Sequence, residues 1–125
     1  MIIVRNAPDE LLVREICSKC SLRADEYTGA YMVFEDARVI GNCIYKLKDK
    51  EGMIIFADLN ITSEEDISDL TLRTVTDYMM RHGAKKLVSY ASFPEKVYKS
   101  VGFTLTENGG EVNLENFTLT HCCGH

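Results

Sequence analysis

The chain has 125 residues, of which 46% are hydrophobic and 26% charged, and its formal net charge at pH 7 is −5. This length and composition predict one globular domain over residues 1–125 that can bury a single core without disulfides or a structural metal. The acidic balance without a basic run argues against nucleic acid as a partner, and no apolar run is long enough to cross a membrane.

The start of the chain and its cysteines indicate a compartment. The first residues lack the charged segment and the long apolar stretch of a signal peptide, so a cytoplasmic location is expected. The five cysteines are an odd number and are unevenly spaced, so a disulfide framework is not expected. Both observations predict reduced thiols.

The apolar periodicity predicts strands interrupted by two longer helices and a short one. In chain order these elements are a strand at 1–4, a helix at 8–19, strands at 30–34, 38–47 and 53–61, a helix at 67–82, a strand at 86–91, a short helix at 94–100, and a hairpin from Leu105 through 112–120. The three strands between 30 and 61 form a meander, with turns at 35–37 and 48–52, and the Glu-Gly pair 51–52 makes the tight reversal of the second turn. The Asn-Gly-Gly run at 108–110 turns the last hairpin.

Two predictions concern burial. The first helix is expected to begin at Pro8 and to bury one face, made by Leu11, Leu12, Ile16 and Cys20. The strand at 53–61 is apolar nearly throughout, which predicts a central strand covered on both faces.

The long helix is amphipathic. A helical wheel places Ile67, Leu72, Val75, Tyr78 and Met79 in one apolar arc and Asp66, Asp69, Arg73 and Asp77 opposite them. The polar face is expected to be solvated, with His82 as a partner of the helix dipole and Gly83 as the C-terminal stop. Strand, helix and strand in this order predict a right-handed parallel crossover.

Two motifs follow the long helix: GAKKL at 83–87 and YKSVGF at 98–103. Their spacing and the order of elements resemble the GCN5-related N-acetyltransferases (the GNAT superfamily), in which a late Y-x-x-x-G-F segment leads from a short helix into the final hairpin. The likeness covers nearly the whole chain. It implies an α/β (α+β) fold with a mixed, mostly antiparallel sheet, a central parallel βαβ crossover and helices on both faces.

The resemblance also implies a ligand site. Acetyl-CoA would be the co-substrate, a small molecule in a cleft between the fourth and fifth strands, with its pyrophosphate on N–H groups that begin the long helix. The residues implied to line it are Leu59, Ile61, Ser63, Asp66 and Ser68. The family pattern Q/R-x-x-G-x-G/A falls on the last three of these, so neither glycine position holds a glycine.

The turn at 62–66 therefore has its own chemistry. Thr62 with Glu65, or Ser63 with Asp66, makes a capping-box pattern that would occupy the same N–H groups. Four carboxylates also lie in this region, at positions 64, 65, 66 and 69. One such charge about 7 Å from a phosphate repels it by roughly 2 kcal/mol at an effective dielectric of about 20, which predicts a degenerate, weakened cofactor loop.

Two residues are candidates for catalysis. Tyr98 matches the position where many family members keep a tyrosine that protonates the departing thiolate of CoA; the structural alternative is an ordinary residue at the edge of the core. Asp58 lies on the strand that would line the acceptor side, where a carboxylate could take a proton from an amine. The alternative is a solvated or hydrogen-bonded aspartate, and a bulge in that strand would change the face to which Asp58 points.

Side chains of the zinc-ligand type occur as Cys17-x-x-Cys20 and as HCCGH at 121–125. In the implied strand order these groups are several strands apart, so a joint zinc site is disfavoured. A loosely ordered, thiol-rich tail is the favoured interpretation, a metal on the tail alone stays open, and no metal site is predicted. Cys43 is expected to be a small core residue.

Three functions remain open. The first is an acyl-CoA-dependent N-acetyltransferase of a small-molecule or protein amine. The second is a catalytically inactive binding or regulatory module with the same fold, whose cleft holds another ligand or whose sheet edge forms a homodimer. The third is a metal or redox sensor that uses the tail thiols. Binding of acetyl-CoA separates the first two, and metal content tests the third.

Overall fold

A computed structural model describes residues 1–59, 65–115 and 117. Its elements in chain order are β1 (Ile2–Asn6), α1 (Glu10–Lys19), β2 (Thr28–Glu35), β3 (Arg38–Lys48), β4 (Glu51–Leu59), α2 (Glu65–Arg81), β5 (Lys86–Ser89), α3 (Glu95–Val101), β6 (Thr104–Thr106) and β7 (Gly109–Asn113). Within these residues the strands form one sheet in the order β1-β2-β3-β4-β5-β7-β6. β4 and β5 pair in parallel and the other pairs are antiparallel, which confirms the predicted mixed sheet with a central crossover.

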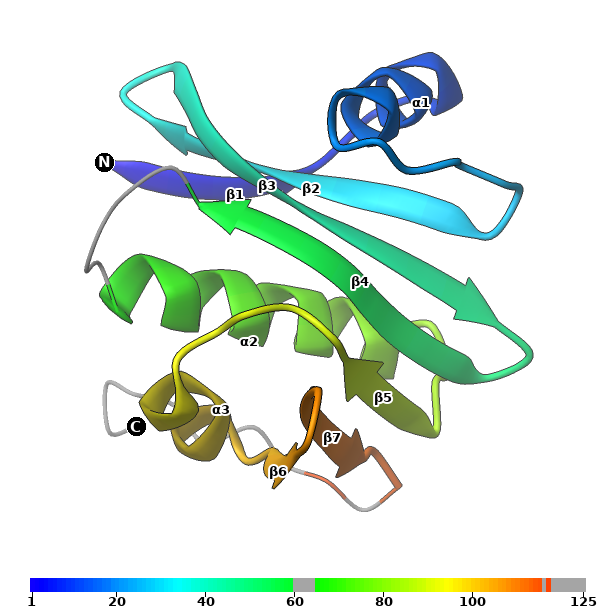
Figure 1. Ribbon diagram of the computed structural model, residues 1–125, viewed down its shortest axis with the longest axis vertical. Coiled ribbons are helices and arrows are strands. Elements are labelled where there is room, and N and C mark those ends of the chain that lie inside the picture. Colours follow the sequence, from blue (N-terminus) through cyan, green and yellow to red (C-terminus); the bar gives the residue numbers. More distant parts are fainter. Residues whose placement is uncertain (60–64, 116, 118–125) are drawn as a thin grey trace.

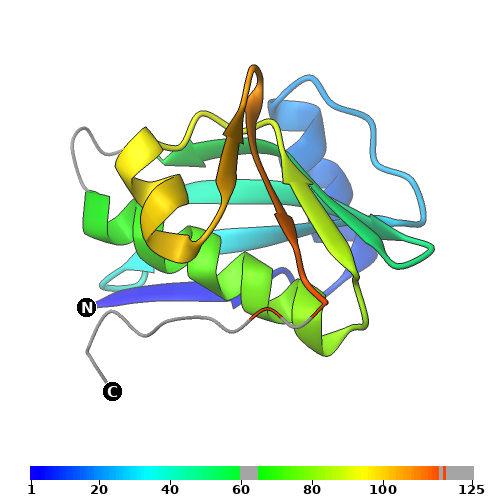
Figure 2. The same ribbon diagram turned by 90° about the horizontal axis from the view of Figure 1, so that it is seen from below.

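Helices cover both faces of the sheet, as predicted (Figures 1 and 2). α1 packs Val13, Ile16 and Cys17 against Ala30 of β2 and Ile44 of β3. α2 and α3 lie on the opposite face, where their apolar side chains join those of β3, β4 and β5 in the largest buried cluster. No helix in the described part of the chain is long and apolar enough to span a membrane.

Two-residue turns connect the meander of β2, β3 and β4. Asp36 and Ala37 have φ values of 48° and 73°, and Asp49 and Lys50 have values of 50° and 66°. Both central residues of each turn are therefore left-handed, which is the type I′ geometry that matches the twist of a hairpin.

The turn predicted over residues 48–52 is confirmed, but its tight reversal is at Asp49 and Lys50 and not at the predicted Glu-Gly pair 51–52. Gly52 lies inside β4, and a Cβ atom there would come within 2.6 Å of the Met79 sulfur on α2. This glycine allows the helix to approach the strand closely and does not form the turn.

The helix boundaries also differ from the prediction. α1 begins after Pro8, because the Asp9 carboxylate caps it by accepting a hydrogen bond from the Leu12 N–H (2.9 Å). Leu11 is 77% exposed, since it lies two residues, about 200° of helix rotation, from the buried Val13. α2 begins at Glu65, two residues before the predicted start, and ends at Arg81, with Gly83 at φ +82° as expected of a stop.

Three further predictions have mixed outcomes. The apolar arc of α2 is confirmed, except that Tyr78 is only half-buried. Thr71 and Thr76 are buried as well, and their hydroxyls are satisfied by hydrogen bonds to carbonyls of the same helix. β4 is not covered on both faces, since Met53 and Phe56 are each 38% exposed on the α1 side. The last strand ends at Asn113, so the predicted strand at 112–120 was too long, and the β6–β7 turn is at residues 107–108.

β4 contains one more residue than β3 at one point. This bulge lies at Ile55, because its two neighbours each pair with a residue of β3: Ile54 with Tyr45, and Phe56 with Ile44. Side chains alternate along a strand, so the extra residue moves Phe56 and Asp58 to the face of α1 and moves Leu59 to the face of α2. The bulge thus settles the orientation of Asp58.

The pairing of β4 with β5 stops at the same place. It runs from Glu51 to Ile54, and the Tyr90 N–H donates the last hydrogen bond to the Ile54 carbonyl (2.9 Å). The chain then turns away toward α3 (Figure 1). Among the described residues, positions 55–59 of β4 have β3 on one side and no strand on the other. We call this divergence, between residues 55–59 and 90–93, the fork.

The β2–β3 turn allows a test of the backbone geometry. Replacing Ala37 by Gly should stabilise the protein by about 0.5–1 kcal/mol, because alanine is strained in the left-handed region and glycine is not. The unfolding midpoint in urea measures the change. As a control, Arg38→Gly replaces an exposed strand residue next to the turn and should destabilise the protein. Equal losses in both variants would contradict the assigned turn geometry.

Candidate functional site

Asp58 lies on the α1 side of the fork. It is exposed and stands opposite Asn42 in the register of β3 and β4. The Asn42 amide oxygen is 3.9 Å from the Cys20 sulfur, at the end of α1, and accepts a weak hydrogen bond from it. Burial and the nearby Asp58 charge raise the pKa of the Cys20 thiol, so this thiol stays protonated and serves as the donor. Asp58 itself faces solvent, where a carboxylate is able to accept a proton.

Tyr98 lies on the other side of the sheet. It is 2% exposed, and its ring centroid is 5.7 Å from that of Phe93 and 5.5 Å from that of Phe103. Its hydroxyl donates a hydrogen bond to the Ala91 carbonyl (2.5 Å) and lies 2.7 Å from Ser89 Oγ. Burial raises the pKa of the phenol, while the hydrogen bond with Ser89 acts in the opposite direction.

Two cavities lie on either side of this region. The first has a volume of about 280 Å³ and is lined by residues on both sides of the Tyr98 hydroxyl: Ala91, Ser92, Phe93, Glu95, Tyr98, Leu105, Thr106, Asn108 and Gly109. The second, on the α1 face, has a volume of about 570 Å³, and its lining includes Met53 and Tyr90, the latter 49% exposed. The lining also holds three lysines and two carboxylates: Lys46, Lys48, Lys86, Asp49 and Glu51. This cavity reaches the fork at Tyr90.

The residues expected to hold a cofactor are only partly brought together. Leu59 ends β4 and is half-buried, and Asp66 and Ser68 lie in the first turn of α2. The first four backbone N–H groups of any helix have no partner within that helix, so those at the start of α2 need a side-chain cap, water or a ligand. Ile61 and Ser63 lie outside the described residues. The predicted capping-box pairs depend on the same segment and on the side chain of Glu65, which is also outside the description.

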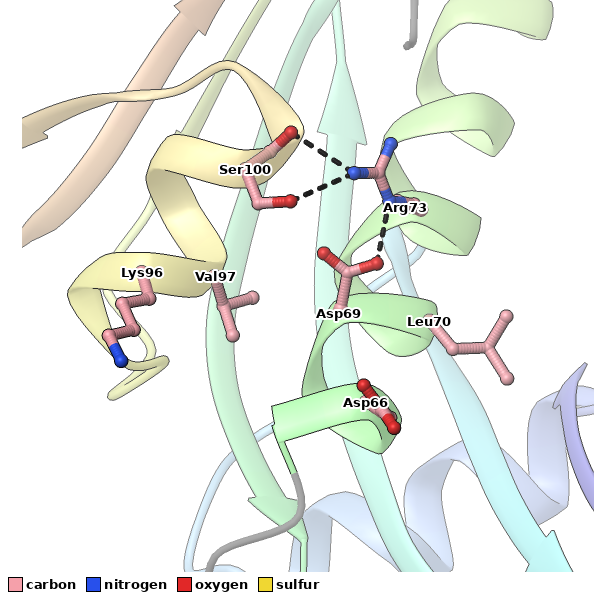
Figure 3. Close-up of a pocket in the computed structure, with 7 residues that line it drawn as sticks. All are labelled: Asp66, Asp69, Leu70, Arg73, Lys96, Val97 and Ser100. Atoms are coloured by element: carbon pink, nitrogen blue, oxygen red, sulfur yellow. Dashed lines mark hydrogen bonds and ion pairs between the residues drawn. The ribbon is translucent and has the colours of Figure 1, made fainter. Parts of the chain in front are cut away.

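A third cavity of about 450 Å³ separates the start of α2 from α3 (Figure 3). At its edge, Arg73 Nε donates a hydrogen bond to the Asp69 carboxylate (2.6 Å), and Arg73 Nη2 donates to the carbonyl (3.0 Å) and hydroxyl (3.1 Å) of Ser100. Arg73 thus joins α2 to α3. Lys96 of α3 lines the same cavity, and Asp66 is exposed at its other end.

This arrangement corrects the prediction of a solvated acidic face. The side chains of Asp69 and Arg73 are only 18% and 14% exposed, and they neutralise each other. Of the four carboxylates counted near the helix start, Asp69 is therefore matched by a cation. Asp66 is the carboxylate in the described part of that turn whose charge faces the cavity.

Sequence reasoning overlooked part of this region. Asp69 and Arg73 were placed on the polar face of the long helix, at an i, i+4 spacing that allows an ion pair, but the contact of this pair with α3 was not expected. The sequence analysis missed Ser89, a polar residue that ends β5 and is fully buried. Cys17 and Cys20 are free thiols, and the described residues contain no group of three or more side chains able to hold a metal ion. The tail at 121–125 lies outside the description.

Solved structures share this fold. The ribosomal-protein-S18-alanine N-acetyltransferase from Escherichia coli superposes with a TM-score of 0.65 and 13% identity over 95% of this chain and 100% of its own. GCN5 from Tetrahymena gives a TM-score of 0.62 and 12% identity over 94% and 99%. The PaiA N-acetyltransferase from Thermoplasma acidophilum, in complex with coenzyme A, gives 0.61 and 18% over 82% and 69%.

At these identities the comparison establishes the fold. The chain has the fold of the GNAT acetyltransferases, as its two motifs predicted. No protein-family model and no curated protein sequence matches the chain.

The Arg73 bridge predicts a difference between two similar ion pairs of α2. Arg73→Leu should destabilise the protein by about 2 kcal/mol, because it leaves the half-buried Asp69 carboxylate and the Ser100 carbonyl without this partner. Arg81→Leu breaks the exposed pair with Asp77 and should cost less than about 0.5 kcal/mol. Thermal unfolding of both variants measures the contrast, and equal losses would refute the role assigned to the bridge.

Proposed function

We propose that this protein is an acyl-CoA-dependent N-acetyltransferase whose reaction takes place at the fork. The observation that carries this proposal is the divergence of β4 from β5 at Ile54, with Asp58 on one face of the sheet and Tyr98 on the other. A slot between two strands, with a carboxylate on one side and a phenol on the other, suits a reaction that removes a proton from one reactant and returns one to another.

The described residues fit acetyl-CoA as a substrate in part. Residues 55–59 of β4 offer backbone N–H and C=O groups on the side that lacks a strand, and such groups bind an extended, amide-containing chain. The start of α2 offers N–H donors to phosphate. The cavity between α2 and α3 adds the Lys96 ammonium. The Asp66 carboxylate acts against this site, since it would repel a phosphate at the same helix end.

The proposed roles of the side chains follow from where they lie. Asp58 takes a proton from the acceptor amine, whose nitrogen lone pair forms the new bond to the acyl carbon. The carbon–sulfur bond of the thioester breaks, and the sulfur leaves with the electron pair. The Tyr98 phenol gives its proton to that thiolate and becomes a phenolate until solvent returns a proton. The reaction yields an amide and free CoA, with protons and electrons balanced.

The acceptor is proposed to approach from the α1 face. The cavity there reaches the fork at Tyr90, and its lining includes the Asp49 and Glu51 carboxylates, which attract an amine, as well as lysines and apolar side chains. Both a small molecule and a protein amine fit an open surface of this kind. These features support an acceptor site on this face and leave its chemical class open.

A second candidate is a binding or regulatory module without turnover. Two observations favour it: the Asp66 carboxylate at the start of α2, and the hydrogen bond of the Tyr98 hydroxyl with the Ala91 carbonyl, which holds the proton that catalysis would need. In this case the cleft would hold a different small molecule. The two candidates differ in whether acetyl-CoA binds and in whether Tyr98 matters for turnover.

Calorimetric titration with acetyl-CoA tests binding. We expect saturable binding, and Asp66→Asn should tighten it about three- to tenfold at physiological ionic strength, because a repulsion of roughly 2 kcal/mol is partly screened by salt. Asp77→Asn, near the other end of the same helix, is the matched control and should leave the affinity unchanged. Absence of heat at millimolar acetyl-CoA, in the wild type and in Asp66→Asn, would rule out the transferase.

Substitution of Tyr98 tests catalysis. Tyr98→Phe should lower kcat at least about a hundredfold with little change in acetyl-CoA affinity, since it removes the proton donor and keeps the ring. Tyr27→Phe, which alters a tyrosine on the loop before β2, should have no effect. Thermal melting must show that both variants are folded. Full activity of folded Tyr98→Phe would assign Tyr98 to the core alone.

A further inference from the structure

Tyr98 does not stand alone, because a fully buried hydroxyl lies next to it. Ser89 is 0% exposed and is the last residue of β5, immediately before the chain leaves β4. Its Oγ is 2.7 Å from the Tyr98 hydroxyl oxygen and accepts a hydrogen bond from the Ala91 N–H (3.3 Å). A buried hydroxyl with two such partners is part of a network and not a solvated surface group.

The positions of the protons follow from counting donors. Tyr98 has one O–H, and it donates that proton to the Ala91 carbonyl. The Ser89 Oγ–H is therefore the donor in the contact between the two hydroxyls, with the Tyr98 oxygen as acceptor. The backbone N–H of Phe93 interacts with the same oxygen and, like Ser89, acts to lower the pKa of the phenol. Both contacts would persist if the phenol lost its proton.

The surrounding packing leaves Ser89 little freedom. A Cβ atom at Gly109 would lie 2.0 Å from the Ser89 carbonyl oxygen, and one at Gly110 would lie 2.8 Å from the Tyr98 ring. The backbone of β7 therefore presses directly against both residues. This close contact fixes the Ser89 backbone and the Tyr98 ring, which carry the two hydroxyls, relative to β7.

We propose that Ser89 is a positioning residue for Tyr98: its hydroxyl holds the phenol at the Ala91 carbonyl and stabilises the phenolate once the proton has left. The inference rests on the proposed transferase function for its second half only. The first half, that Ser89 holds the phenol, concerns the protein without substrate. One hydroxyl thereby links the end of β5, where the fork opens, to the group proposed to donate the proton.

The test compares Ser89→Ala with Ser89→Thr, which restores the hydroxyl. In Ser89→Ala, kcat should fall about tenfold with an unchanged KM for acetyl-CoA, and the alkaline limb of the pH profile should move to higher pH because a stabiliser of the phenolate is gone. Ser89→Thr should recover at least part of the rate. In the Tyr98→Phe background, Ser89→Ala should lower kcat no further.

A second measurement needs no turnover. The ¹³Cζ signal of Tyr98, identified by its absence in Tyr98→Phe, should shift in Ser89→Ala and return toward the wild-type position in Ser89→Thr. Thr76→Val is the control, because it removes another fully buried hydroxyl, one bonded within α2, and should change neither the signal nor kcat. If the wild type has no turnover, this signal still decides whether Ser89 holds the phenol.

The outcomes are separable. An unmoved Cζ signal in folded Ser89→Ala overturns the positioning role, whatever the activity. A moved signal with equal kcat losses for Ser89→Ala in the wild-type and Tyr98→Phe backgrounds overturns the catalytic half. A moved signal with no additional loss in the Tyr98→Phe background supports the whole proposal, whereas absence of turnover in every variant counts against the transferase alone.

Discussion

The extra residue at Ile55 is the constraint on which the arrangement of the candidate site depends. A bulge bends its strand and increases the local twist, and β4 loses its pairing with β5 directly before this position. The same residue changes the face on which the rest of β4 presents its side chains. Without it, Asp58 would point to α2 and Leu59 to α1. The opening between the strands and the placement of a carboxylate beside it therefore have one cause.

Much of the fold could be predicted because its signals are local. Apolar periodicity marked the strands and the long helix, and Gly83 stops that helix with a left-handed φ as expected. The bulge could not be predicted, because the residues around Ile55 are almost all apolar and an apolar run does not reveal which face each side chain takes. Gly52 was misread as a turn, because the sequence does not show how closely α2 approaches.

The charges and hydrogen bonds of the candidate site also could not be predicted in full from the sequence. Counting carboxylates near the start of α2 overstated the repulsion, because the partner of Asp69 is fixed by the packing of α2 on α3. Tyr98 could be placed from its motif. The hydrogen bonds of its hydroxyl could not, because its partners are Ser89, at the end of β5, and Ala91, in the loop that follows. Residue types predicted which groups are present, and tertiary contacts decide their charge and proton state.

The two-residue turns at Asp36-Ala37 and Asp49-Lys50 have a consequence for the order of folding. They make the β2–β3–β4 meander a local structure whose strands meet with almost no loop to close. Pairing β5 with β4 requires closure through the whole of α2, and this costs roughly 2 kcal/mol more in chain entropy than a two-residue loop. Contacts of high sequence separation form late, so we expect the meander to form early and the fork last. The backbone around the fork would then also open most readily in the native state, which suits a region proposed to admit and release ligands.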